Sequence, residues 1–144
     1  MSDWEYLTLE KDDRILIVSF DSLNQINSLN IKLMRELTSL AIDLQQDNEL
    51  SAVVLRGNDT MFTGGMNLKD SEILSARDGT MADERILAKV GPSMCAAWEA
   101  LDLVTIAAIE GWCIGGGVAL AAACDWRVAG SDAKIYVPEL KLGM

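Results

Sequence analysis

The sequence contains no histidine among its 144 residues, so the commonest general base and metal ligand near neutral pH is missing. Any acid–base chemistry must therefore use carboxylates, tyrosine, lysine or cysteine. Basic residues are also scarce: 12 lysines and arginines stand against 22 aspartates and glutamates, which gives a formal charge of −10. A chain this acidic repels the phosphates of a nucleic acid, so we expect no nucleic-acid partner. A phosphorylated small ligand stays possible, because it needs only a few local donors.

Cysteine occurs only at Cys95, Cys113 and Cys124, an odd number, and two of these lie in strongly apolar runs. This pattern predicts reduced core thiols of a cytosolic protein rather than a disulfide framework, and the spacing matches no zinc site. No apolar stretch reaches the roughly 18 residues of a membrane span. The first residues are acidic and lack the basic and apolar regions of a signal peptide. We therefore expect a soluble, cytoplasmic protein with no metal site and no membrane partner.

Half of the residues are apolar, which is enough for the core of one domain. Residues 6–10 and 15–20 are expected to form a β-hairpin, and further strands are expected over 52–55, 104–109, 126–129 and 134–137. Helices are expected over 30–46 with Asn30 as its N-cap, over 84–101 with a kink at Gly91-Pro92, and over 118–123. Residues 62–67 are expected to form a loop, which a polar stretch through Asp83 follows, and 111–117 to be a glycine-rich turn. Strands alternating with helices predict an α/β fold.

Two of the expected strands run into consecutive glycines, at Gly64-Gly65-Met66 and at Gly115-Gly116-Gly117. Glycine permits positive φ and lets a ligand approach the backbone closely. At a helix start the free N–H groups create a positive local field, and two such groups aimed at one oxygen form an oxyanion hole. Tight turns and close packing explain either loop equally well when it is taken alone. A nucleotide-binding loop is disfavoured, since the Lys-Ser/Thr and Gly-x-Gly-x-x-Gly patterns are missing.

Glu139 follows a proline at the end of an expected strand and lies between Val137 and Leu140. A carboxylate in apolar surroundings has a raised pKa and could shuttle a proton near neutral pH. The alternative is an exposed glutamate on a turn, which the local sequence taken alone favours.

Taken together, these segments resemble the enoyl-CoA hydratase/isomerase (crotonase) family. The family's first loop reads roughly Phe-x-Ala-Gly-x-Asp-Leu/Ile-Lys, and residues 62–69 correspond to it as Phe-Thr-Gly-Gly-Met-Asn-Leu-Lys. Its second reads roughly Gly-x-x-x-Gly-Gly-Gly-x-x-Leu-Ala-x-x-Cys-Asp, and residues 111–125 answer it without a gap. A Pro-Glu followed by a glycine is matched by Pro138-Glu139 and Gly143, and Asn27-Ser28-Leu29 fits the family's opening.

The resemblance implies a crotonase-like spiral of ββα units, with residues 1–144 as an incomplete N-terminal catalytic core. Family members are longer, and their C-terminal helices complete the acyl pocket and build trimers or hexamers. We therefore expect the C-terminal helical part to be missing here and to be supplied by the full-length protein or by a second chain. The expected partners are an acyl-CoA substrate and further copies of the chain in a homotrimer or hexamer.

The resemblance also implies the roles of individual residues. The backbone N–H groups of Met66 and Gly116 would hold the thioester oxygen of the acyl-CoA, and Glu139 would move the proton. The residues expected along coenzyme A are Gly64, Asn67, Leu68 and Lys69, with Asn24 and Ile26 as weaker assignments because the usual Asn-Arg-Pro is missing there. Coenzyme A enters only as part of the substrate, so no permanently bound cofactor is expected.

The chain departs from the hydratases of the family at one acid–base position. Hydratases carry two glutamates, and the first would fall at position 119, where this sequence has Ala119. A single glutamate still serves a proton shuttle, so the sequence favours Δ3,Δ2-enoyl-CoA isomerisation over hydration. A non-catalytic acyl-CoA-binding member is the third alternative. Asn67 also replaces the usual aspartate, which is expected to change loop hydrogen bonding more than chemistry.

Overall fold

A computed structural model describes residues 3–21 and 25–143 and shows an α/β fold with two sheets. The larger sheet has five strands in the order β1-β2-β3-β5-β7 and the smaller has three in the order β4-β6-β8. The strands of the larger sheet are β1 (Leu7–Asp12), β2 (Ile15–Phe20), β3 (Ala52–Arg56), β5 (Val104–Ile109) and β7 (Trp126–Ala129). Those of the smaller are β4 (Met61–Thr63), β6 (Trp112–Ile114) and β8 (Lys134–Tyr136). Apart from the antiparallel β1–β2 hairpin, all of these strand pairs are parallel.

The chain alternates between the two sheets in a regular way. Strands β3, β5 and β7 of the larger sheet are each followed directly by β4, β6 and β8 of the smaller one. Helices then follow the first two of these pairs: α2 (Ser71–Arg77), α3 (Met81–Ala88) and α4 (Val90–Glu99) after β4, and α5 (Gly116–Ala123) after β6. The predicted spiral of ββα units is confirmed.

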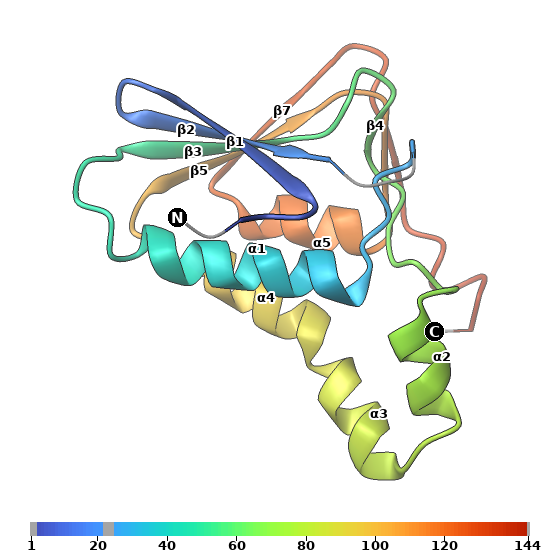
Figure 1. Ribbon diagram of the computed structural model, residues 1–144. Coiled ribbons are helices and arrows are strands. Elements are labelled where there is room, and N and C mark those ends of the chain that lie inside the picture. The colour runs from blue at the N-terminus through green and yellow to red at the C-terminus, as the bar shows by residue number, and fades with distance from the viewer. Residues whose placement is uncertain (1–2, 22–24, 144) are drawn as a thin grey trace.

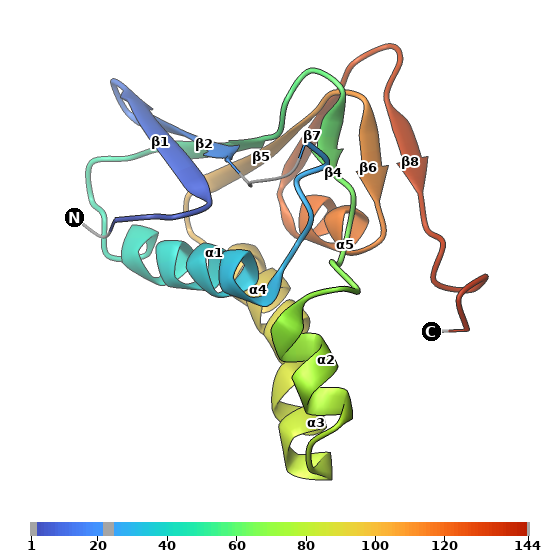
Figure 2. The same ribbon diagram turned by 45° about the vertical axis from the view of Figure 1, so that its right-hand side comes forward.

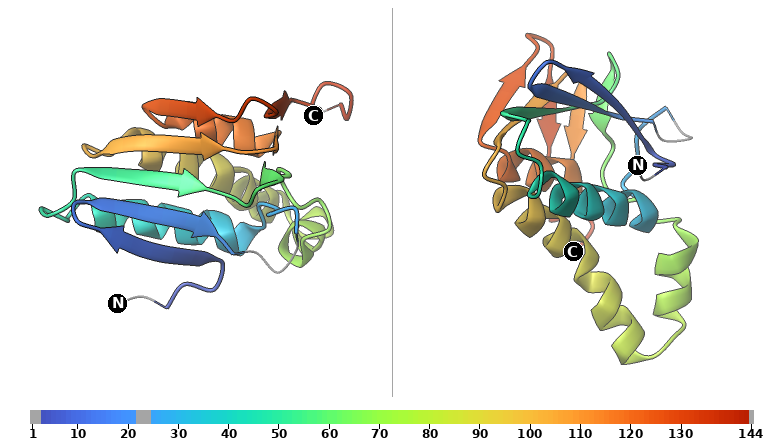
Figure 3. Two further views of the ribbon diagram at one scale, coloured as in Figure 1. Left: turned by 90° about the horizontal axis from the view of Figure 1, so that it is seen from above. Right: turned by 60° about the vertical axis from the view of Figure 1, so that its left-hand side comes forward.

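The helices α1 (Ile31–Leu44), α4 and α5 lie together along one face of the larger sheet (Figures 1 and 3). Seven residues of α1 at helical spacing are buried, as the apolar periodicity predicts. Asn30 caps this helix through a hydrogen bond that its side chain accepts from the Leu33 N–H, so the predicted N-cap is confirmed. The indole of Trp98 on α4 is buried and donates to the Leu37 carbonyl at 3.0 Å, which joins the two helices. Within the described residues, no helix is long and apolar enough to cross a membrane.

Several local predictions were wrong. The expected helix over 84–101 is two helices, α3 and α4, which meet at Lys89 rather than at Gly91-Pro92. The polar stretch through Asp83, where no helix was expected, contains α2 and the start of α3. Strand β4 overlaps the segment that was expected to be a loop, and β6 lies within the expected glycine-rich turn. These strands have only three residues each, too few for an alternating pattern to register.

Helices α2 and α3 form a hairpin that projects away from the sheets (Figures 1 and 2). Thr80 and Asp83 form a capping box at the start of α3, and the hydrogen bonds from Thr80 lower the pKa of the Asp83 carboxyl. Arg35 of α1 ties the hairpin back to the body by an ion pair with Glu72 at 2.8 Å. The hairpin buries little apolar surface, which explains why its sequence shows no strong helical stripe.

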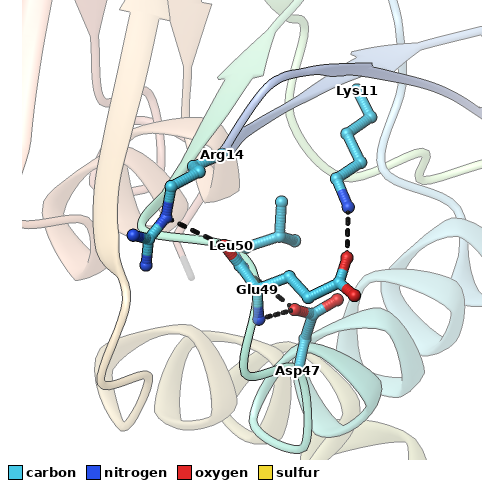
Figure 4. A network of polar contacts seen from close by, with 5 residues as sticks. All are labelled: Lys11, Arg14, Asp47, Glu49 and Leu50. Carbon is cyan, nitrogen blue, oxygen red and sulfur yellow. Dashed lines mark hydrogen bonds and ion pairs between the residues drawn. The ribbon is translucent and has the colours of Figure 1, made fainter.

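A network of polar contacts joins the β1–β2 turn to the segment before β3 (Figure 4). Lys11 pairs with the Glu49 carboxylate at 2.7 Å, and the Arg14 side chain donates to the Glu49 carbonyl at 3.1 Å. The backbone N–H groups of Leu50 and Glu49 both donate to Asp47, which lowers the pKa of its carboxyl. These groups are exposed, so the network orients the turn and contributes little to stability.

Candidate active site

The smaller sheet brings three strand ends to one edge of the molecule. Because β4, β6 and β8 run parallel, their carboxyl ends lie at the same edge of the sheet (Figure 2). Each strand is followed within three residues by a predicted catalytic residue: Met66 after β4, Gly116 after β6 and Glu139 after β8. Ligand sites of open parallel sheets commonly lie at such carboxyl ends.

Two glycines allow the three segments to touch. Gly65 has φ +85°, and a Cβ there would lie 2.8 Å from the Ile114 carbonyl oxygen. Gly115 has φ +56°, and a Cβ there would lie 2.6 Å from the Glu139 Oε1. Both positions therefore require glycine for conformation and for space. The glycines are therefore required for close packing, as one of the two interpretations of the sequence held. The segments that they pack together are the two glycine loops and Glu139.

The backbone N–H of Met66 is available to a ligand. Leu29 donates its N–H to the Gly65 carbonyl at 2.8 Å and accepts from the Asn67 N–H at 3.1 Å. Met66 lies between these two bonds, and its own N–H makes no hydrogen bond to any described residue.

Gly116 offers a second N–H at the start of α5. The N–H groups of Val118 and Ala119 both donate to the Gly115 carbonyl, and that of Gly116 makes no hydrogen bond within the described part of the chain. The first N–H groups of a helix have no partner inside it and carry a partial positive charge. The buried Leu29 packs against Gly116 as well, since a Cβ there would lie 3.2 Å from its Cδ1. Leu29 therefore contacts both segments that carry a free N–H.

Glu139 lies in a turn after β8 and is partly buried. Its Oε2 is fully buried and has no hydrogen-bond partner among the described residues. The strand end before it is anchored by the Gly115 N–H, which donates to the Tyr136 carbonyl at 2.9 Å. The turn itself is held by N–H groups of Lys141 and Leu142 that donate to the Pro138 carbonyl. The alternative of an exposed turn glutamate is thus wrong, although the turn is present.

The residues expected along coenzyme A follow the first glycine loop. The Gly64 N–H donates to the Ile26 carbonyl at 2.7 Å, so these two positions lie together, and the Ile26 side chain is exposed. The side-chain oxygen of Asn67 accepts a hydrogen bond from the Lys69 N–H at 3.1 Å. Asn67 stands where the family usually has an aspartate, and this is its hydrogen bond within the loop. Leu68 and Lys69 are exposed. Asn24 lies outside the described residues.

An apolar cavity opens beside Met66. It has a volume of about 260 Å³ and is lined by Ile31, Met66, Ile73, Ala76, Arg77, Glu84, Leu87 and Ala88. Most of these residues belong to the projecting hairpin, whose Ile73, Ala76 and Leu87 give the cavity its apolar side. Two larger hollows, of about 430 and 330 Å³, lie around Arg35 and include none of the predicted site residues.

The buried thiols near the site are not nucleophiles at neutral pH. Burial raises the pKa of Cys113, on β6, to about 11, and burial also raises that of Cys124 to about 11. All three cysteines are free, as the sequence predicts. No group of three or more histidine, cysteine, aspartate or glutamate side chains within the described ranges could hold a metal ion.

The family model of the enoyl-CoA hydratase/isomerase family matches residues 10–144. A protein of Mycobacterium bovis named as a probable enoyl-CoA hydratase is 33% identical over 144 residues, which cover 98% of this chain and 52% of that protein. A mitochondrial Delta(3,5)-Delta(2,4)-dienoyl-CoA isomerase of Dictyostelium discoideum is 33% identical over 153 residues, covering 100% of this chain and 52% of that one.

The solved structure of an enoyl-CoA hydratase/isomerase from Marinobacter aquaeolei superposes with a TM-score of 0.89 and 28% identity. The superposition covers 97% of this chain and 54% of that one. The chain thus spans about half the length of the relatives it matches. Because the family model covers nearly the whole chain and the fold agrees, this chain belongs to the enoyl-CoA hydratase/isomerase family.

Proposed function

We propose that the protein binds an acyl-CoA thioester and catalyses Δ3,Δ2-enoyl-CoA isomerisation, with Glu139 as the single proton shuttle. The observation that carries the proposal is the Oε2 of Glu139, which is buried near Gly115 and has no hydrogen-bond partner in the part of the chain that the structure describes. A buried carboxylate oxygen without a partner is costly, so such atoms concentrate where a reaction uses them.

In this mechanism the N–H groups of Met66 and Gly116 donate to the thioester oxygen. A proton leaves C2 for Glu139, and the electron pair of the broken C–H bond moves onto the thioester, giving a dienolate. Two donors aimed at the developing negative charge lower the barrier by roughly 3 kcal/mol each. Glu139 then returns the proton to C4 while the double bond settles between C2 and C3 and the thioester carbonyl reforms. No net proton is gained or lost, and no second acid is needed.

The surroundings of the two N–H groups support an acyl thioester as the ligand. The apolar cavity of about 260 Å³ begins at Met66, so a thioester held there could place its acyl tail among Ile31, Ile73 and Leu87. Gly64 precedes Met66 in the chain and is hydrogen-bonded to Ile26, while Asn67, Leu68 and Lys69 follow Met66; we assign these residues to the coenzyme A moiety. Lys69 supplies a local positive charge for a phosphate on a chain that is acidic as a whole.

Hydration of a 2-enoyl-CoA is the second candidate. It is supported by the hydratase name of the Mycobacterium bovis relative. Against it stands Ala119, since this position offers no side chain to activate water. A third candidate, acyl-CoA binding without turnover, is motivated by the same residue.

The proposal is tested with the full-length protein and a trans-3-enoyl-CoA, by following the conjugated 2-enoyl product in the ultraviolet. We expect conversion by the wild type and a loss of about 10²- to 10⁴-fold in Glu139→Gln. The control is Glu99→Gln, which changes an exposed glutamate at the end of α4 and should leave the rate unchanged.

Each alternative has its own outcome in this assay. Faster hydration of a 2-enoyl-CoA than isomerisation of the 3-enoyl-CoA would replace the isomerase by the hydratase. Tight acyl-CoA binding with neither reaction would leave only the binding role. Full activity in Glu139→Gln would show that another group is the base.

A further inference from the structure

Thr63 is a buried polar residue that neither the family motif nor the proposed mechanism uses. It is the last residue of β4, its side chain is completely buried, and the strand register shifts between Met61 and Thr63 where β4 pairs with β6. Such bulges re-aim side chains and are frequent beside active sites.

The hydroxyl of Thr63 holds the first glycine loop. Its Oγ1 accepts the Gly65 N–H at 3.0 Å, while the Gly65 carbonyl accepts the Leu29 N–H at 2.8 Å. Both polar groups of Gly65 are therefore fixed. Because the peptide unit is planar and trans, the Met66 N–H must point away from the Gly65 carbonyl, opposite to Leu29. The Leu29 bond fixes the peptide plane that carries this N–H, and the Thr63 bond fixes the peptide plane directly before it.

The methyl group of Thr63 contacts the second loop. A Cβ on Gly117 would lie 2.3 Å from the Thr63 Cγ2, closer than any real contact, so the methyl fills the space beside a glycine in the first turn of α5. Gly117 directly follows Gly116, whose N–H is the second free donor. One side chain therefore contacts both segments that carry the free N–H groups.

We propose that Thr63 is a positioning residue that sets the direction and spacing of the Met66 and Gly116 N–H groups. The inference rests on the proposed function, because it assigns Thr63 to the same oxyanion hole. A valine would fill the same volume without the hydroxyl, and a serine would keep the hydroxyl without the methyl. These two substitutions separate positioning by the hydrogen bond from packing.

The test compares Thr63→Val and Thr63→Ser in the full-length protein by kcat, KM and the infrared carbonyl stretch of a bound saturated acyl-CoA. The stretch reports polarisation of the thioester by the two N–H donors and needs no turnover. Because a misplaced donor acts mainly on the transition state, we expect Thr63→Val to lose about 10- to 100-fold in kcat with KM changed less than about threefold. Its carbonyl shift should be smaller, and Thr63→Ser should recover most of both losses.

The matched control is Thr105→Val, which removes another buried threonine, whose hydroxyl bonds to Asp125 at the amino ends of β5 and β7 rather than at the carboxyl ends of β4, β6 and β8. It should lower the melting temperature and leave kcat and the carbonyl shift unchanged. If Thr63→Val keeps the wild-type kcat and carbonyl shift, the inference is overturned. It is also overturned if Thr63→Ser or Thr105→Val loses as much kcat and carbonyl shift as Thr63→Val does.

Failure of the proposed function is distinguishable from failure of this inference. Glu139→Gln should keep the carbonyl shift while losing turnover, since the shift depends on the N–H donors alone. If the wild type turns over enoyl-CoA and Thr63→Val shows the same carbonyl shift as the wild type, only the positioning role is overturned. A wild-type protein that shows no carbonyl shift would overturn both.

Discussion

At the scale of single residues, the site depends on one carboxylate and on what surrounds it. Glu139 reaches its place because Gly115 has no Cβ to block Oε1. Its other oxygen is buried without a partner among the described residues. In a chain without histidine, we propose this carboxylate as the proton acceptor.

Ala119 gives a gain-of-function prediction. It lies exposed on α5, one turn after Gly116, so a longer side chain can be accommodated there. We expect Ala119→Glu to raise the rate of 2-enoyl-CoA hydration at least tenfold, because a second carboxylate can activate water. Rates of hydration and isomerisation should be measured side by side.

The control for this substitution is Ala122→Glu, which adds the same charge to an exposed position of the same helix. It should not promote hydration. An equal gain in both variants, or no gain in Ala119→Glu, would refute the assignment of position 119.

At the scale of elements, the site is made by three very short strands. Strands β4, β6 and β8 have three residues each, yet their parallel register places Met66, Gly116 and Glu139 at one edge. Helix α5 begins at this edge and contributes the positive end of its dipole. Each strand is followed by its site residue within three positions.

The contact between β4 and α5 gives a stability prediction. Gly117→Ala would place a Cβ 2.3 Å from the Thr63 methyl and should destabilise the protein by about 1–3 kcal/mol, although alanine favours the helix. Combining it with Thr63→Ser removes the clashing methyl, so the double variant should be more stable than the sum of the single changes predicts. Chemical denaturation of the four proteins in a double-mutant cycle measures this coupling.

Gly91→Ala is the matched control for that cycle. It also changes a helical glycine, but a Cβ there would meet only the Met34 sulfur at an ordinary 3.9 Å. This variant should be neutral or stabilising. Strictly additive energies for Gly117→Ala and Thr63→Ser would contradict the contact.

The elements differ in how well the sequence predicts them. Residues 15–20, 104–109 and 126–129 were predicted with their observed bounds, because apolar and β-branched runs end at turn residues. Helix α1 was predicted through its buried stripe and the cap at Asn30. Helix α2 was missed because only Ala76 of its residues is buried, so its sequence carries no apolar periodicity.

The site was predicted only through the resemblance. From the local sequence alone, the glycine loops could equally be tight turns and Glu139 an exposed turn residue. The local sequence does not show that β4, β6 and β8 are neighbours. Thr63 was missed because its two contacts, with Gly65 and Gly117, depend on that tertiary arrangement.

At the scale of the whole molecule, apolar side chains remain exposed along β7, β8 and the residues after them. The most exposed of these are Trp126, Val128, Ile135, Val137, Leu140 and Leu142. Exposed apolar surface of this extent is typical of interfaces. It agrees with the expectation of further family structure and of a homotrimer or hexamer, which stay predictions for the full-length protein.

The central claim is that Glu139 removes the C2 proton of a thioester held by Met66 and Gly116. The most direct test is exchange of the C2 protons of a saturated acyl-CoA with solvent deuterium, followed by proton NMR in the full-length protein and in Glu139→Gln. We predict exchange in the wild type and none above background in the variant. Equal exchange rates in both proteins, or no exchange in either, would contradict the account.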